Sequence, residues 1–270
     1  MSGGAAVTRT TTYPVFPQGL PDPVDGRGKY QVRFASNLEE LETVQRLRFE
    51  VFNLELGEGL EESYATGLDQ DRFDPTCHHL MVVDLEANKV VGTYRIQTHE
   101  MAEAHGGFYS SDEFDLRGLP ADVRANAIEV GRASVALDYR NQKVLFLLWR
   151  GLAAYMQKNA KRFLFGCCSL TSQNPADGKW VMDYLEENDH CHPQHVVQPQ
   201  PEWLCYPAGF DPGAPPEPVK LPKLFRTYMR YDAKVCGPPA IDRTFKTIDY
   251  LVLLDVDQLD GVTRALFFGR

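Results

Sequence analysis

The chain has 270 residues, 43% of them hydrophobic and 24% charged, and its formal net charge is −9 at pH 7. A chain of this length can bury a full core, and its negative charge argues against a general nucleic-acid-binding protein, whose surface would be basic. The sequence shows no hydrophobic run as long as a membrane span and no signal peptide, so we expect a cytoplasmic protein.

The first elements are an arm, a strand and a helix. Residues 1–29 are rich in Gly, Pro and Thr without periodicity, which predicts a flexible or strapped-on arm. Alternation over 30–35 predicts a strand, and Ser36 or Asn37 then caps a helix. Arg48 lies on or next to the apolar face of that helix. An arginine at the edge of a core face and a functional arginine are both open interpretations.

A polar loop over 57–75 follows and contains three close carboxylates, Asp69, Asp71 and Asp74. The loop resembles a calcium-binding loop at first glance. It lacks the glycine at the sixth position and the closing glutamate at the twelfth, so we reject a calcium site. A solvated acidic loop is the default interpretation.

Two strands over 79–85 and 90–97, joined by a short turn, predict a hairpin. Arg95 lies inside the second strand, where a guanidinium group usually needs a carboxylate partner. Residues 100–124 show no clear period and are expected to form a loop.

The central stretch over 126–159 begins as a strand, turns at 137–141 and continues as a helix with apolar residues at three- and four-residue spacing. A strand that ends at a helix N-terminus leaves backbone N–H groups that bind phosphate. Glu129 and Arg132 lie in the strand just before that turn. The arrangement predicts an enzyme that holds a phosphate-bearing cofactor and carries out chemistry beside it.

The second half of the chain adds an interior strand at 162–170, a helix at 174–188 and two final strands at 227–235 and 248–256. Between them, residues 190–222 form an unusually long irregular segment, which tends to be functional. Several connections are hairpin-short. We therefore predict one mixed α/β (α+β) domain whose central sheet is mostly antiparallel and flanked by helices.

One group of metal-type ligands lies in the irregular segment: His190, Cys191, His192, His195 and Cys205. Their spacing matches no zinc finger or ribbon, so a polar surface loop is the default and we predict no metal site.

The order of these elements resembles the GNAT acyltransferase superfamily. Arg48, the aspartate loop, 92–95 (GTYR) and 129–132 (EVGR) resemble the motif set of acyl-homoserine-lactone synthases. The segments 129–151 and 221–254, the latter with AKVCGPPAID, more closely resemble the ornithine N-acyltransferases of ornithine-lipid synthesis. Order and spacing together make the resemblance specific.

The resemblance implies a GNAT-like domain over 30–258 with a Pro-rich insert at about 189–224, between the N-terminal arm over 1–29 and a C-terminal tail over 259–270. It also implies an N-acyltransferase that moves a (3-hydroxy) fatty acyl group from acyl carrier protein to the α-amine of ornithine, giving lyso-ornithine lipid. An N-acyl synthase for another amino acid, or an acyl-homoserine-lactone synthase, is the alternative.

The phosphate turn departs from the superfamily pattern. Residues 140–145 (RNQKVL) have Lys and Leu where glycines let the backbone close on a pyrophosphate. The sequence therefore favours a phosphopantetheine thioester on acyl carrier protein as donor, without excluding CoA, and no bound cofactor. Basic residues around the helix suit an acidic carrier protein, although ordinary surface charges explain them too. The predicted donor-binding residues are Val135, Arg140, Asn141, Lys143 and Val144.

In the mechanism that the resemblance implies, Glu129 is the candidate base for the α-amine, directly or through one water, with Arg132 beside it. A backbone N–H of the strand over 132–135 would stabilise the oxyanion. The predicted substrate-binding residues are Arg48, Asp69, Asp71, Asp74 and Arg95. A purely structural charge network is the open alternative for each of them.

The Pro-rich insert is the expected place for the acyl chain. Apolar and aromatic residues over 203–225 would line an apolar channel, touch the inner face of the membrane as a peripheral contact, or only cover the sheet. They are Trp203, Leu204, Tyr206, Phe210, Leu221, Leu224 and Phe225. The sequence leaves all three open.

Overall fold

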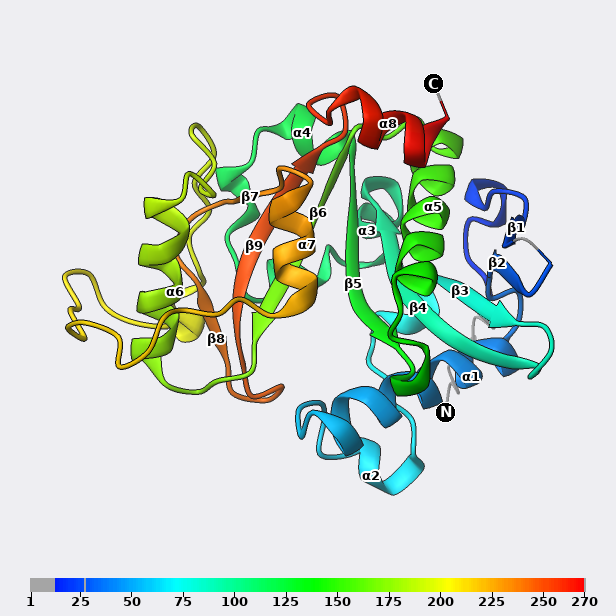
Figure 1. Ribbon diagram of the computed structural model, residues 1–270, viewed down its shortest axis with the longest axis horizontal. Coiled ribbons are helices and arrows are strands. Elements are labelled where there is room, and N and C mark those ends of the chain that lie inside the picture. Colours follow the sequence, from blue (N-terminus) through cyan, green and yellow to red (C-terminus); the bar gives the residue numbers. More distant parts are fainter. Residues whose placement is uncertain (1–12, 27, 270) are drawn as a thin grey trace, which may run out of the picture.

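The computed structural model describes residues 13–26 and 28–269. Its centre is a nine-stranded sheet with the order β1-β2-β3-β4-β5-β6-β9-β7, and β8 also pairs with β9 (Figure 1). Every pair is antiparallel except β5 with β6, which confirms the mostly antiparallel sheet. The strands are β1 (Val24–Gly26), β2 (Tyr30–Phe34), β3 (His78–Asp84), β4 (Lys89–Thr98), β5 (Ala127–Val135), β6 (Phe163–Leu170), β7 (Lys234–Val235), β8 (Ala240–Asp242) and β9 (Thr247–Asp255).

Helices lie on both faces of this sheet. The α-helices are α1 (Leu38–Phe49), α2 (Ser63–Thr66), α3 (His99–His105), α4 (Ala121–Ala125), α5 (Gln142–Lys158), α6 (Pro175–Glu187), α7 (Lys223–Arg230) and α8 (Gly261–Phe268). A π-helix, η2 (Glu50–Glu55), continues α1. The short 3-10 helices are Pro17–Gly19, Asp74–Thr76, Tyr109–Ser111, Leu116–Gly118, Leu137–Tyr139 and Pro201–Trp203.

Strand β3 shows why the sheet needs cover on both faces. All seven of its residues are buried, and its four apolar residues alternate between two cores. Leu80 and Val82 belong to the core on the α5 side, whereas Met81 and Val83 belong to the core on the α1 side. A third core, with Phe108, lies beneath β6 and β9. The sheet is therefore the middle layer of the domain.

The sheet opens between its two parallel strands. β5 and β6 pair only from Ala127 to Glu129, after which β5 continues along β4 and β6 continues along β9. In Figure 1 the two ribbons run together at the top and separate below. Gly166 lies at the fork, where an added Cβ would come within 2.1 Å of the Val130 carbonyl oxygen. Only glycine permits this close approach.

Three stretches differ from the sequence prediction. Residues 100–124 hold short helices rather than a loop, because elements of five to seven residues are too short to show a period. The strand predicted over 227–235 is wrong: residues 227–230 end helix α7, a turn follows, and β7 has only two residues. Of the two forms predicted for the arm, flexible or strapped-on, residues Tyr13 to Gly26 take the second and lie against the domain, since β1 pairs with β2 and the Val15 carbonyl bonds His78 at 2.6 Å. Residues 1–12 of that prediction lie outside the described residues.

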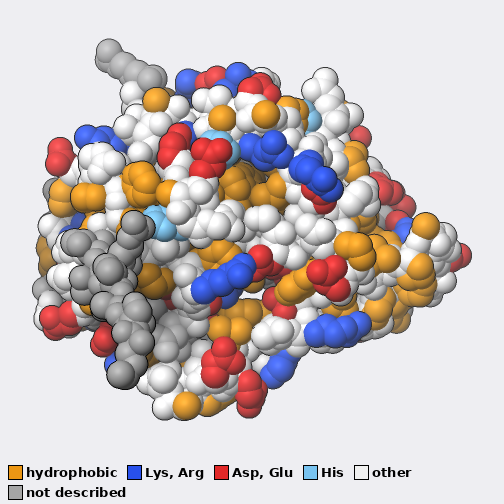
Figure 2. Space-filling view, turned by 180° about the vertical axis from the view of Figure 1, so that it is seen from behind, with side chains coloured by type: hydrophobic (Ala, Val, Ile, Leu, Met, Phe, Trp, Pro, Cys, Tyr) orange, Lys and Arg blue, Asp and Glu red, His pale blue; other side chains and the backbone are white. Residues whose placement is uncertain are grey.

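The C-terminal stretch forms α8, which packs against α5. On the face seen in Figure 2, acidic and basic side chains are interspersed with hydrophobic ones. Within the described part of the chain, no helix is both long and apolar enough to cross a membrane.

Candidate active site

A cavity of about 450 Å³ lies where β5 and β6 separate. Its polar lining comes mainly from β5, β9 and residues 109–113, and its apolar lining from α5 and α7. This volume is in the range of small-molecule sites, which are mostly apolar with a few polar groups. The fork of the sheet thus supplies the candidate site.

Glu129 lines this cavity and is 5% exposed. Its Oε1 accepts hydrogen bonds from the backbone N–H of Ser110 at 2.7 Å and from the Ser110 hydroxyl, and its Oε2 accepts from the Tyr109 N–H at 2.8 Å. Burial raises the pKa of Glu129, although the bonds from Ser110 and Tyr109 partly oppose this. A carboxylate whose pKa is moved towards neutrality is suited to proton transfer.

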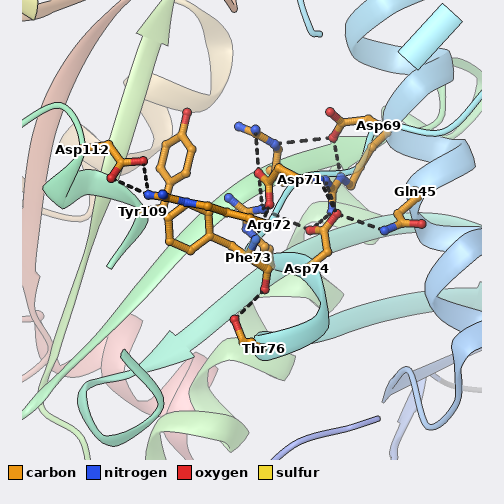
Figure 3. A network of polar contacts seen from close by, with 12 residues as sticks. Gln45, Asp69, Asp71, Arg72, Phe73, Asp74, Thr76, Tyr109 and Asp112 are labelled. Atoms are coloured by element: carbon orange, nitrogen blue, oxygen red, sulfur yellow. Dashed lines mark hydrogen bonds and ion pairs between the residues drawn. The ribbon is translucent and has the colours of Figure 1, made fainter. Parts of the chain in front are cut away.

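The residues predicted to bind substrate form one buried ion-pair network (Figure 3). Arg48, which is fully buried, donates from Nε to Asp69 at 2.6 Å and from Nη1 to Asp74 at 2.8 Å. Gln45 adds a bond to Asp74 at 3.0 Å. The solvated acidic loop that the sequence suggested as default is therefore wrong, because Asp69 and Asp74 are buried and paired with arginine.

Two strand arginines complete the network. Arg95 of β4 donates to Asp71 at 2.6 Å and to Asp74 at 3.0 Å, which confirms that it needs a carboxylate partner. Arg132 of β5 donates to Asp71 at 3.0 Å, and its Nε lies 3.5 Å from Asp69. Burial alone would raise the pKa of Asp71, but Arg95 and Arg132 hold that pKa at about 2. Three guanidinium groups thus balance three carboxylates.

Only part of this network touches the cavity. Arg95 and Arg132 line it, whereas Arg48 and the aspartates Asp69, Asp71 and Asp74 do not. The aspartates instead hold the two strand arginines from behind. The structure therefore brings the predicted substrate-binding residues together, but places most of them one layer away from the cavity.

Arg132 has a left-handed backbone, with φ of +50°. The register of β4 against β5 shifts between Thr93 and Arg95, so β5 carries an extra residue there. Such a conformation is strained for a residue other than glycine, and it occurs where surrounding contacts enforce it. The ion pairs of Arg132 and the Phe245 ring, 4.0 Å from its guanidinium carbon, supply those contacts. Beyond Glu129, β5 pairs with a strand on one side only, so its other backbone edge is open beside the cavity.

The predicted donor site is largely occupied by contacts within the chain. Asn141 caps α5 and accepts from the backbone N–H groups of Lys143 and Val144 at 3.0 and 3.2 Å. Arg140 pairs with Glu55 and donates to the Val135 carbonyl at 3.1 Å. The Lys143 amine lies 4.9 Å from the centre of the Tyr30 ring. Val135, Arg140 and Asn141 line the cavity, whereas Lys143 and the buried Val144 do not.

A second group of carboxylates escaped the sequence analysis. Glu113, Asp242 and Asp249 are buried, and they form the one set of metal-type ligand atoms that converges within the described ranges, all within 4.8 Å of one another. Glu113 follows a 3-10 turn, Asp242 ends β8 and Asp249 lies in β9. No motif links residues so far apart along the chain; only the fold brings them together. The buried Gln97 of the cavity wall, whose side-chain amide makes no hydrogen bond to a described residue, was missed for the same reason.

Comparison with known proteins identifies the family. Residues 47–150 match the family model described as acetyltransferase (GNAT) domain. The chain is 32% identical over 244 residues to an L-ornithine N(alpha)-acyltransferase of Brucella abortus, covering 87% of each chain. It is 31% identical to the protein of the same name from Rhizobium meliloti, covering 86% of this chain and 81% of the relative.

A solved structure supports the fold alone. The chain resembles FeeM, an N-acyl amino acid synthase from uncultured soil microbes, with a TM-score of 0.50 and 13% identity over 88% of this chain and 93% of that one. The relatives from Brucella abortus and Rhizobium meliloti, in contrast, are similar over most of their length, which shows the family. The chain belongs to the L-ornithine N(alpha)-acyltransferase family and is an acyltransferase with a GNAT-like fold.

Proposed function

We propose that this enzyme transfers a (3-hydroxy) fatty acyl group from a thioester on acyl carrier protein to the α-amine of ornithine, giving lyso-ornithine lipid. The observation that carries the proposal is Glu129, a buried carboxylate with a raised pKa at the wall of a largely apolar cavity. The names of the relatives support ornithine as the acceptor.

Glu129 acts as the base in this proposal. A free α-amine has a pKa near 8, so it must lose a proton before or during attack. The amine nitrogen attacks the thioester carbonyl carbon, a C–N bond forms and the C–S bond breaks. The amine proton passes to Oε2 of Glu129, directly or through one water, and the pantetheine sulfur leaves as a thiolate that takes up a proton. No covalent enzyme intermediate is needed.

The oxyanion of this reaction needs hydrogen-bond donors in place. The open edge of β5 over 132–135 lies in the cavity wall, and backbone N–H groups there are suited to the role. Arg95 and Arg132 add positive charge next to the same wall. Their aspartate partners fix the guanidinium groups, so in this proposal Arg48, Asp69, Asp71 and Asp74 position the site rather than contact the substrate.

The acyl chain would lie against the apolar wall. Leu145 and Leu148 of α5 face Leu224, Phe225 and Tyr228 of α7 across the cavity lining. Each methylene buried there is worth about 0.8 kcal/mol. Trp203 and Phe210 are not part of that lining; Trp203 packs against the core beneath β6 and β9. Of the residues that the sequence suggested for a channel, Leu224 and Phe225 line the cavity, and the channel proposal now rests on them and the rest of α7.

The donor would approach at the junction of β5 and α5. The cavity is lined there by Val135, Arg140 and Asn141. The first turn of α5 follows and contains Lys143 and Val144. Leu137 is 65% exposed next to this junction, and Leu56 of the cavity wall is 42% exposed. Basic and apolar groups at one opening suit an acidic carrier protein with a lipid cargo. The same leucines would serve a peripheral contact with the membrane that takes up the product.

The test is incubation of the purified protein with 3-hydroxyacyl carrier protein, the matching acyl-CoA and an amino-acid panel, with products identified by mass spectrometry. The expected result is an amide of ornithine formed faster from the carrier protein than from CoA. Faster turnover with CoA would overturn the donor assignment, and acylation of a different amino acid in preference to ornithine would overturn the acceptor assignment.

A further inference from the structure

Glu113, Asp242 and Asp249, here called the acidic trio, lie at the cavity with almost no exposure: 1%, 2% and 3%. Glu113 and Asp249 are part of the cavity lining. Three carboxyl groups this close repel one another when ionised, and burial adds a desolvation penalty. Three ionised carboxyl groups can be held together in this way only if protonation, hydrogen bonds or a cation offset that free-energy cost.

The protein itself supplies no cation for the trio. Across the described residues, none of the three forms an ion pair with a Lys, Arg or His nitrogen within 4.0 Å. Arg132 lowers the pKa of Glu113, but its guanidinium group is engaged with Asp69 and Asp71. The acidic trio therefore lacks the counter-charge that every carboxylate of the arginine network has.

The hydrogen bonds of the trio are also incomplete. Asp242 accepts from the backbone N–H groups of Thr244 and Phe245 at 2.7 and 2.8 Å, and Asp249 accepts from the hydroxyls of Ser169 and Thr247. Oε1 of Glu113, in contrast, is buried without a hydrogen-bond partner among the described residues. Because Glu113 lines the cavity, this oxygen can accept a hydrogen bond from a donor group of a bound ligand.

We propose that the acidic trio binds the side-chain ammonium group of the acceptor amino acid and thereby selects a diamino acid. This inference rests on the proposed function and adds the residues that determine its specificity. An ammonium group has three N–H donors and one positive charge, which matches three converging carboxyl groups around one unpaired oxygen.

Contacts within the chain connect the trio with the proposed base and set an upper limit on their separation. A series of contacts leads from Glu129 to the Ser110 hydroxyl, from there to the Cys167 sulfur at 3.6 Å, and from Cys167 to Oε2 of Glu113 at 3.9 Å. The two nitrogens of ornithine are roughly 6 Å apart when its chain is extended, from standard bond lengths. In this proposal one molecule places its α-amine at Glu129 and its side-chain ammonium at the trio.

The pKa values of Glu113 and Asp249 in the ligand-free protein support the proposal that the trio binds an ammonium group. Burial and the neighbouring carboxyls raise the pKa of Glu113 well above its usual range, and burial raises the pKa of Asp249 to about 6. Protonation relieves the repulsion in the empty cavity, and an arriving ammonium group would restore the ionised form.

The test compares ornithine with norvaline, which has the same carbon skeleton without the terminal ammonium. Glu113→Gln and Asp249→Asn should each lower the ratio of kcat/KM for ornithine over norvaline by about 10- to 100-fold, the range expected for a hydrogen bond to a charged group. Asp112→Asn, one residue before Glu113 and 45% exposed, is the matched control and should leave the ratio as it is.

Melting temperatures show whether the variants fold, and Glu113→Gln should melt no lower than the wild type because it removes a buried carboxyl. Calorimetric titration with ornithine and norvaline gives a second measurement that does not need turnover. Weaker ornithine binding in Glu113→Gln, with norvaline binding retained, supports the inference.

Two results would overturn it. One is an ornithine-to-norvaline ratio that both variants leave unchanged while the wild type acylates α-amines, in which case the acyltransfer proposal stands without the trio. The other is binding of Mn²⁺ or Ca²⁺ by the wild type that Glu113→Gln abolishes and ornithine does not compete with. Absence of ornithine acylation in the wild type would overturn the proposed function instead, and the calorimetric comparison would still decide the role of the trio.

Discussion

Two carboxylate clusters flank the same cavity and differ in how their charge is balanced. Asp69, Asp71 and Asp74 meet three arginines of the same chain, and every carboxylate there has an ion-pair partner. The acidic trio has no such partner among the described residues and contains an unpaired oxygen. The arginine network also contains a buried oxygen without a hydrogen-bond partner in the described ranges, Oδ1 of Asp69, so the clusters differ in charge balance and not in that respect. The charge of the first cluster is balanced within the chain, whereas in our proposal the charge of the second is balanced when a cation enters.

This difference indicates what each cluster does. A balanced network with little exposure holds strands and loops in one arrangement, here β4, β5 and the loop before β3. An unbalanced cluster at a cavity wall is unstable by itself and gains most when a ligand supplies the missing charge.

The largest effect should follow from breaking the balanced network. Asp74→Asn removes the carboxylate that accepts from Arg48, Arg95 and Gln45 and leaves buried guanidinium charge without compensation. Unfolding in urea should show a loss of about 3–5 kcal/mol. Arg72→Ala breaks the exposed pair with Asp112 and should cost no more than about 1 kcal/mol. Equal losses in the two variants would refute the distinction between a buried network and surface pairs.

Glu129 lies between the two clusters, and its replacement should affect chemistry rather than folding. Glu129→Gln retains acceptors and shape, so we expect a melting temperature close to that of the wild type. Turnover at saturating substrates should fall roughly 100-fold, the usual contribution of a general base. A turnover number that does not change would exclude Glu129 as the base.

The pH dependence of stability should separate the clusters. Asp249 has a folded pKa of about 6, above its unfolded value, so its stabilising contribution is present at low pH and is lost as the pH rises through 6. Asp71 has a folded pKa of about 2, so its contribution is present above about pH 4 and is lost only below that.

Denaturant unfolding at pH 5 and pH 8 measures this difference. Asp249→Asn should gain about 1 kcal/mol relative to the wild type between pH 5 and pH 8. Asp71→Asn should differ from the wild type by the same amount at both pH values. An Asp249→Asn difference that does not vary with pH would mean that this carboxyl is not under strain in the empty cavity.

The smallest effect concerns the donor. Arg140→Ala combined with Lys143→Ala should raise the KM for acyl carrier protein a fewfold, because Glu55 already pairs with Arg140 and the helix N-terminus is capped by Asn141. The effect should shrink as salt is added. Lys89→Ala with Arg117→Ala removes the same charge from exposed positions outside α5 and is the control. An equal rise in KM for ornithine would instead indicate a damaged helix.

Much of this architecture could be predicted from the sequence because its signals are local. The β3–β4 hairpin, the long helix α5 and the Asn174 cap follow from periodicity and side-chain capping. The strand predicted over 227–235 failed because α7 has only eight residues, and its buried Phe225, Tyr228 and Met229 are too few to reveal a helical period.

The site divides in the same way. The resemblance to known families indicated Glu129, Arg132 and the aspartate loop, since those residues belong to contiguous motifs. The acidic trio could not be found, because its members join a loop, a strand end and a strand that meet only in the folded chain. The sequence also suggested an open phosphate site at 140–144. In the structure, Asn141 already accepts hydrogen bonds from the backbone N–H groups of Lys143 and Val144, and Arg140 pairs with Glu55.

Proton release on substrate binding tests the contrast between the clusters most directly. Titration calorimetry at pH 6 in buffers of different ionisation enthalpy gives the number of protons exchanged when ornithine binds. If the trio is short of a cation, ornithine should release protons from Asp249 and Glu113, whereas norvaline should not, and Glu113→Gln should reduce the release. Equal proton exchange for ornithine and norvaline would contradict the account, because the trio would then be indifferent to the charge that it is proposed to bind.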